Sequence, residues 1–216
     1  MKLIKIEYLN VKGDFQDKEE FKTVMKVLKD RIIALTFNSP DKFVINPTKK
    51  GNGVKPISRK FCRELPEGWK GETTYPLMDG VDPGPIDVFI DTGDGRIAVE
   101  WETGNISSSH RALNKLAIGI ITKRIEAGIL ILPSKALYPF LTDRVGNYDE
   151  FAPYFILYRN LQFDKGLLAV IVVEHDETSE EVPLIPKGKD GNAIRRMAKK
   201  KVTKRGVKKK KVKKRY

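Results

Sequence analysis

Three carboxylates on two neighbouring segments, Asp87, Glu100 and Glu102, have the types and the spacing to bind a divalent cation. Residues 86–90 and 97–101 are rich in Ile, Val and aromatic side chains, which predicts two β-strands joined by a Gly/Asp-rich turn. Glu100 and Glu102 leave their strand on one face, and an antiparallel partner would bring Asp87 opposite them. Oxygen ligands favour a hard cation such as Mg²⁺. A solvated, acidic hairpin end is the simpler alternative.

The chemistry that such a cluster supports best is hydrolysis of a phosphodiester. One or two Mg²⁺ ions can activate the attacking water and neutralise charge on the phosphoryl oxygens. Asp87 and Glu100 are candidate ligands, and the backbone carbonyl of Trp101 could add another. Glu102 could orient or deprotonate the water, whose pKa a bound cation lowers.

The elements that must position these carboxylates can be predicted from apolar periodicity. Residues 18–35 carry apolar side chains at helical spacing, and a second helix is predicted from a cap at Ser107 or Ser108 to about Glu126. Residues 128–132 form a continuous apolar run, typical of a strand covered on both faces. Further strands are predicted at 1–9, 43–45, 154–158 and 167–173, a short helix at 134–141, a loop at 46–57 and irregular structure at 58–85. The pattern predicts an α/β fold with a mixed central β-sheet flanked by helices.

The charge of the chain is concentrated at its end. The 41 Lys and Arg residues include 14 within residues 195–216, so 27 basic residues stand against 28 acidic ones before that point. We therefore predict one folded domain over 1–194 and a disordered Lys/Arg-rich tail over 195–216. Such a tail attracts polyanions, with nucleic acid the expected partner ahead of an anionic membrane surface.

Composition excludes several classes of protein. No apolar stretch reaches transmembrane length and the first residues lack a signal-peptide pattern, so we expect no membrane association and a cytoplasmic location. The single cysteine, Cys62, excludes an internal disulfide and a Cys-rich zinc site. His110 and His175 are too few and too scattered for a histidine metal centre.

Pro85-Ile86-Asp87 followed by Glu100-x-Glu102 resembles the PD-(D/E)xK nuclease core with Glu in the usual Lys position, a variant characteristic of BamHI-type restriction endonucleases. Segments 43–57, 102–115, 138–155 and 182–191 are also similar to that family, in the same order. The resemblance implies a restriction-endonuclease-like fold and a homodimer that cuts both strands of double-stranded DNA. It further implies Mg²⁺ dependence, the palindrome GGATCC, 5′-phosphate ends and a cognate DNA methyltransferase. The family has another acidic residue near the metal, for which Glu72 is the candidate.

Candidate DNA-reading residues accompany the carboxylates. Asp can accept a hydrogen bond from cytosine and Arg can bond guanine, so the Asp143-Arg144 pair could read one G·C pair. Arg111 with Asp190 could read a second.

Asn105 and Ser107 begin a predicted helix, where polar groups can reach the major groove. By resemblance, these two residues join Arg111, Asp143, Arg144 and Asp190 in a set of six that reads DNA, together with the loop around Gly188. Lys55 is a candidate for base or phosphate contact. Taken singly, each has a simpler explanation as a salt bridge, a helix cap or an exposed charge.

Two other functions compete with a site-specific enzyme. A structure-selective repair or recombination nuclease would keep the three carboxylates but would not need the base-reading residues. A non-catalytic basic DNA-binding protein would use the carboxylates only to cap a hairpin, and Glu102→Ala would then leave its activity unchanged.

Overall fold

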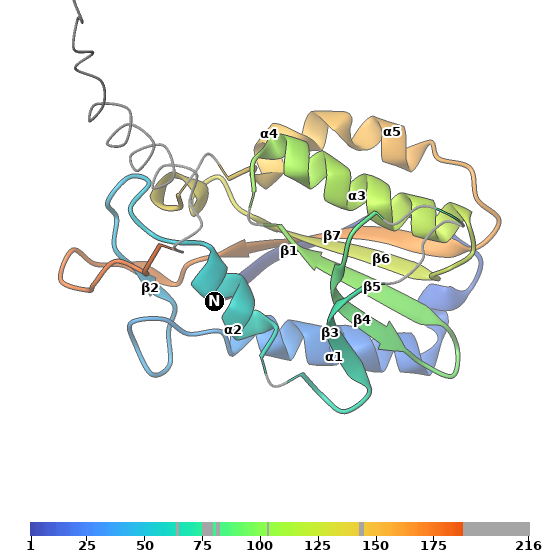
Figure 1. Cartoon of the computed structure of the whole chain (residues 1–216), viewed down its shortest axis with the longest axis horizontal. Helices are drawn as coiled ribbons and strands as arrows, with labels where there is room; N and C mark the ends of the chain where they lie inside the picture. The colour runs from blue at the N-terminus through green and yellow to red at the C-terminus, as the bar shows by residue number, and fades with distance from the viewer. Residues whose placement is uncertain (64, 75–79, 81–82, 103, 143–144, 188–216) are drawn as a thin grey trace, which may run out of the picture.

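The computed structural model describes residues 1–187 except 64, 75–79, 81–82, 103 and 143–144. A six-stranded sheet in the order β1-β7-β6-β5-β4-β3 forms its centre (Figure 1). Its strands are β1 (Lys2–Lys12), β3 (Trp69–Thr73), β4 (Ile86–Asp91), β5 (Arg96–Trp101), β6 (Ala127–Pro133) and β7 (Gly166–Glu174). Strands β5, β6 and β7 are parallel, and the other pairs are antiparallel. The mixed α/β sheet predicted from the sequence is confirmed.

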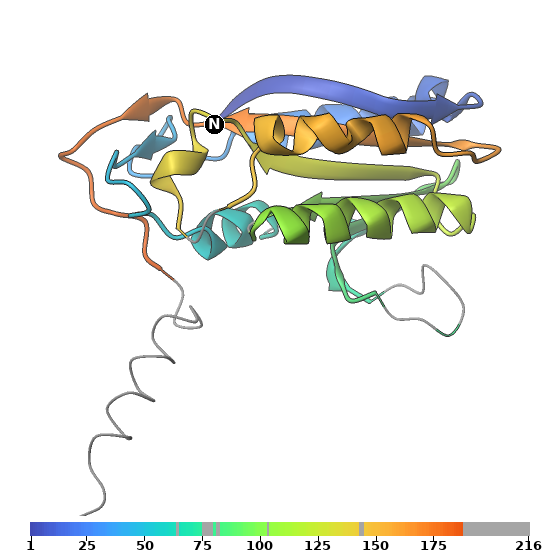
Figure 2. The ribbon, with the colours of Figure 1, turned by 90° about the horizontal axis from the view of Figure 1, so that it is seen from above.

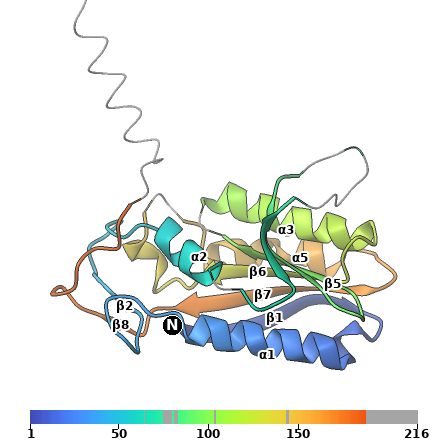
Figure 3. The same ribbon diagram turned by 60° about the horizontal axis from the view of Figure 1, so that its bottom comes forward.

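Helices cover both faces of the sheet, which explains why the central strands are apolar throughout. Helix α1 (Glu19–Ile33) lies on one face and α3 (Ile106–Ile121) on the other, as Figure 3 shows. The short helices α4 (Tyr148–Phe151) and α5 (Phe155–Arg159) lie beside α3 (Figure 2), and Tyr158 Oη donates to Asn114 Oδ1 at 2.8 Å. Each face therefore has its own apolar core, and β6 is buried over its whole length.

Smaller elements complete the described chain. They are α2 (Lys55–Phe61), the parallel pair β2 (Val44–Ile45) and β8 (Glu177–Thr178), and three 3₁₀ turns at Phe15–Asp17, Tyr138–Phe140 and Ala152–Tyr154. None of the helices within the described residues has the length and apolar character needed to cross a bilayer. The predicted tail, 195–216, lies outside the described residues.

Three local predictions need correction. Residues 154–158 are not a strand but end a 3₁₀ turn and form α5, because their buried side chains, Phe155 and Tyr158, are spaced for a helix. The region 58–85 is not irregular throughout, since it contains most of α2 and all of β3. Asn105, not Ser107 or Ser108, caps α3, and its side chain accepts from the Ser108 N–H at 3.1 Å.

A polar cluster joins β1 to the helical layer. The Glu7 carboxylate is 13% exposed and ion-pairs with Lys5 and Arg159, while the Tyr148 hydroxyl donates to it. Burial alone would raise the pKa of Glu7, but these hydrogen bonds outweigh it and lower the pKa from 4.5 to about 2. The folded state therefore binds a proton at Glu7 less readily than the unfolded chain does.

Glu7→Gln should lower the free energy of unfolding by about 1–2 kcal/mol at pH 7, because the half-exposed partners Lys5 and Arg159 are screened by solvent. Because the pKa of Glu7 is lowered on folding, its contribution is present above about pH 5 and disappears as the pH falls towards 2. Urea unfolding of both proteins at several pH values measures the difference. If the difference in free energy of unfolding between the two proteins stays constant down to acidic pH, the lowered pKa of Glu7 is not its source.

Candidate active site

The β4–β5 hairpin brings Asp87 and Glu100 together, as the sequence predicted. The register pairs Val88 with Val99, so the next position places Asp87 opposite Glu100. Asp87 Oδ2 accepts a hydrogen bond from the backbone N–H of Trp101 at 2.7 Å, which fixes the aspartate against the end of β5. The Trp101 side chain itself is buried against Phe61, with ring centroids 4.7 Å apart.

Glu102 follows directly after β5. Its backbone N–H donates to Ile131 O at 3.1 Å, so the pairing with β6 extends to this residue. Its carboxylate accepts from the N–H of Gly104, which orients the side chain at the end of the strand. Glu102 is close enough to Glu100 to raise the pKa of that carboxyl. The three predicted carboxylates therefore gather at one end of the hairpin.

Glu72 lies beside this group, on β3. It falls between the pairs Gly71–Val88 and Thr73–Ile86, which places it next to Asp87, and its φ of 40° is unusual for a residue other than glycine. Its charge contributes to raising the pKa of Asp87. The structure thus brings the Glu72 candidate into the predicted cluster, held in a strained backbone conformation of the kind that functional sites retain.

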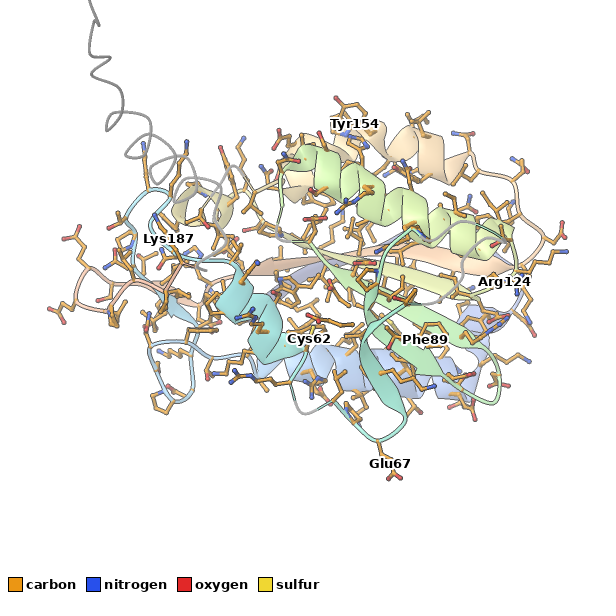
Figure 4. All side chains as sticks on the ribbon, viewed as in Figure 1. Cys62, Glu67, Phe89, Arg124, Tyr154 and Lys187 are labelled. Atoms are coloured by element: carbon orange, nitrogen blue, oxygen red, sulfur yellow. The ribbon has the colours of Figure 1, made fainter. Side chains whose placement is uncertain are left out.

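A cleft of about 270 Å³ opens on Asp87 and Glu72. It lies between α2 and the strands β3 and β4, and Figure 4 labels Cys62, which directly follows α2, and Phe89 on β4 on either side of β3. The residues that line it are Ser58, Arg59, Cys62, Arg63, Gly71, Glu72 and Asp87. Carboxylates that can hold a cation therefore share the cleft with two arginines that can attract a phosphate.

Two sets of residues at this site could not be identified from the sequence. Arg59 and Arg63 belong to a region that was predicted to be irregular, so nothing indicated their proximity to Asp87. Lys115 looked like an ordinary helical charge, yet its ammonium is buried, forms an ion pair with Glu100 and donates to Pro85 O at 2.6 Å. Only its position on the flank of the apolar stripe of α3 hints at burial.

The electrostatics of the cluster indicate a shortage of positive charge. Burial raises the pKa of Glu100 to about 8 in spite of Lys115, and Asp87 and Glu102 add to the rise. Burial also raises the pKa of Asp87, although the Trp101 N–H and Lys115 oppose it. A divalent cation would keep both groups ionised, and the all-oxygen donor set suits Mg²⁺. In the part of the chain that the structure describes, no group of three or more His, Cys, Asp or Glu side chains is arranged, as it stands, to hold a metal ion.

The described DNA-reading candidates lie close to this end of the sheet. Asn105, Ser107 and Arg111 are exposed at the start of α3, and Lys55 is exposed at the start of α2. His110 is packed edge-on against Phe151 and Tyr154 and so has a structural role. The remaining candidates lie outside the described residues: Asp143, Arg144, Gly188 and Asp190.

Comparison with known proteins finds relatives over nearly the whole chain. Residues 1–192 match the family model described as restriction endonuclease BamHI. The chain is 43% identical over 197 residues to the type II restriction enzyme OkrAI of Oceanobacter kriegii, which covers 90% of this chain and all of that one. It is 40% identical over 167 residues to the type II restriction enzyme BamHI of Bacillus amyloliquefaciens, covering 73% and 76% of the two chains.

A solved structure shares the fold. The restriction endonuclease BglII, crystallised with a DNA 16-mer, superposes with a TM-score of 0.51 at 13% identity, over 80% of this chain and 79% of the other. At this identity the similarity establishes the architecture of the sheet and its helices.

Proposed function

Because the chain belongs to the BamHI family of type II restriction endonucleases, we propose that it is a homodimer that cuts both strands of a DNA palindrome in the presence of Mg²⁺. The proposed site is GGATCC and the proposed products carry 5′-phosphates. The observation that carries the proposal is that Asp87, which lies opposite buried Glu100 in the hairpin, also lines a cleft that contains two arginines. A cognate DNA methyltransferase would protect the host's own sites.

Four groups are proposed to hold one or two Mg²⁺ ions: Asp87, Glu100, the backbone carbonyl of Trp101, and Glu72. When bound, the cation neutralises charge on the phosphate and acidifies the attacking water. The hydrogen bond from the Trp101 N–H would hold the Asp87 carboxylate in place beside the proposed metal site. Glu102, which the Gly104 N–H orients, is proposed to position the water and accept its proton.

The start of α3 is proposed to read DNA. Ser107 and Arg111 are one helical turn apart and exposed, so both can face the same groove. Arg111 can bond guanine O6 and N7, and Asn105 and Ser107 can meet neighbouring base edges. Lys55, at the start of α2, is proposed to contact a base or a phosphate. By resemblance, Asp143, Arg144, Gly188 and Asp190 complete the set.

A palindrome calls for a two-fold dimer in which each subunit reads one half-site. Exposed apolar side chains cluster where α5 begins: Tyr154, Ile156 and Leu157 are 47%, 58% and 64% exposed. Figure 4 shows Tyr154 at the outer edge of this helical layer. Exposed apolar side chains beside α3 are suited to an isologous contact between copies of the chain.

Leu157→Glu should convert the dimer to monomer and reduce cleavage at nanomolar protein, because it places a charge in the proposed apolar contact. Sedimentation velocity measures the mass. Ile33→Glu is the matched control, since Ile33 is 57% exposed on α1, on the opposite face. If Leu157→Glu remains as dimeric as Ile33→Glu, the interface lies elsewhere.

Digestion of a sequenced plasmid, with Mg²⁺ and with EDTA, followed by sequencing of the ends, tests the function. The proposal predicts Mg²⁺-dependent fragments that end within GGATCC and carry 5′-phosphates. Discrete ends at another palindrome would preserve the enzyme and overturn the proposed site. Cuts without sequence preference would favour a structure-selective nuclease, and an intact plasmid with folded protein would favour a binding protein.

A further inference from the structure

Lys115 is buried beside the carboxylates although lysine is among the residues least often buried. It is 8% exposed, and its ammonium contacts two neighbours in different segments of the hairpin region. One is the carboxylate of Glu100, on β5, and the other is the carbonyl of Pro85, immediately before β4. A single ammonium on α3 therefore contacts both β5 and the residue before β4, the two segments that carry the proposed ligands Glu100 and Asp87.

The burial of this ammonium needs a reason, because a desolvated charge is costly unless it is paired. Glu100 is itself 7% exposed and has Asp87 and Glu102 close by. Without a positive charge at this position, the acidic groups would repel one another in a region with little water. The Lys115 ammonium meets Glu100 directly, whereas Arg59 and Arg63 line the cleft that opens on Asp87 and Glu72.

We propose that Lys115 is the resident counter-cation of the carboxylate cluster, an inference that rests on the proposed metal-dependent function. In the metal-free protein it holds Glu100 beside Asp87. A divalent cation that binds Glu100 must compete with the ammonium, because two positive charges at one carboxylate repel each other. Lys115 thus stabilises the metal-free site and weakens its affinity for metal. The bond to Pro85 O gives the ammonium an anchor that does not depend on Glu100.

Two variants separate charge from hydrogen bonding. Lys115→Met keeps the apolar stem and removes the ammonium, while Lys115→Gln retains a hydrogen-bond donor without the charge. Lys123→Met is the control, since Lys123 is 75% exposed just after α3 and pairs with Asp164 at the surface. The full chain, without DNA, is titrated with Ca²⁺ alone by calorimetry, and its melting temperature is measured in EDTA and in saturating Ca²⁺.

Both Lys115 variants should melt several degrees below the wild type in EDTA, and Ca²⁺ should remove most of that deficit. Both should bind Ca²⁺ roughly tenfold more tightly than the wild type, because a like charge has been removed from the site. Lys123→Met should match the wild type in every measurement.

Four results would overturn the inference. The Lys115 variants could lose as much melting temperature in Ca²⁺ as in EDTA, or could bind Ca²⁺ with wild-type affinity. Either result would make Lys115 a purely structural residue and leave the proposed function intact. Wild-type behaviour of Lys115→Gln would show that hydrogen bonding suffices without charge. Failure of the wild type to bind Ca²⁺ or to be stabilised by it would overturn the counter-cation and the proposed metal site together.

Discussion

Asp87→Asn should reduce cleavage of a GGATCC-containing duplex by at least about a thousandfold, because it removes charge from a proposed metal ligand. The fold should survive, since the asparagine carbonyl can still accept the hydrogen bond from the Trp101 N–H. DNA binding in EDTA should be retained or become slightly tighter, because one negative charge near the phosphates has been removed.

Single-turnover cleavage, Ca²⁺ calorimetry and a DNA-binding titration together test Asp87. Asp91→Asn is the matched control, because Asp91 is an exposed carboxylate at the other end of the same strand, β4. The assignment predicts that Asp91→Asn cuts and binds Ca²⁺ normally while Asp87→Asn does neither. Normal Ca²⁺ binding by Asp87→Asn would remove Asp87 from the ligand set.

Glu102→Gln should slow cleavage by about 10²–10⁴-fold while Ca²⁺ binding and DNA binding stay close to wild type. Glutamine can still accept the Gly104 N–H, so the side chain keeps its orientation but can no longer take a proton from water. Ca²⁺ affinity should distinguish the two variants. Asp87→Asn removes a proposed metal ligand and should weaken Ca²⁺ binding, whereas Glu102→Gln should not.

Glu67→Gln provides the control for this substitution, since Glu67 is exposed on the loop before β3. Cleavage rates over a range of pH add a second readout. The wild-type rate should rise with pH at low pH, and that dependence should weaken in Glu102→Gln. If Glu102→Gln cuts at the wild-type rate, another group activates the water.

The hairpin and its carboxylates could be predicted because their signals are local. Segments rich in Ile, Val and aromatic residues, a Gly/Asp turn and the two-residue spacing of Glu100 and Glu102 together predict the strands, the turn and the shared face. The helix α1 and the buried strand β6 were predictable for the same reason, since apolar periodicity reflects which faces are covered.

What could not be predicted depends on contacts between distant segments. The burial of Lys115 follows from the packing of α3 over the sheet, mainly over β6, and the sequence near residue 115 gives only a weak hint of it. The segment 154–158 was predicted as a strand because a short apolar and aromatic run fits either structure, and its packing beside α3 decides for the helix. Arg59 reaches the cleft only because α2 lies against β3 and β4.

The backbone of Glu72 sets a conflict between stability and activity in laboratory evolution. A φ of 40° is more favourable for glycine than for glutamate, so glutamate here costs of order 1 kcal/mol or more. A screen that selects only for heat resistance would therefore enrich glycine at position 72 and delete a proposed metal ligand. Thermostable variants of this chain should be selected with DNA cleavage as a second criterion, so that the gain in stability does not come from the catalytic centre.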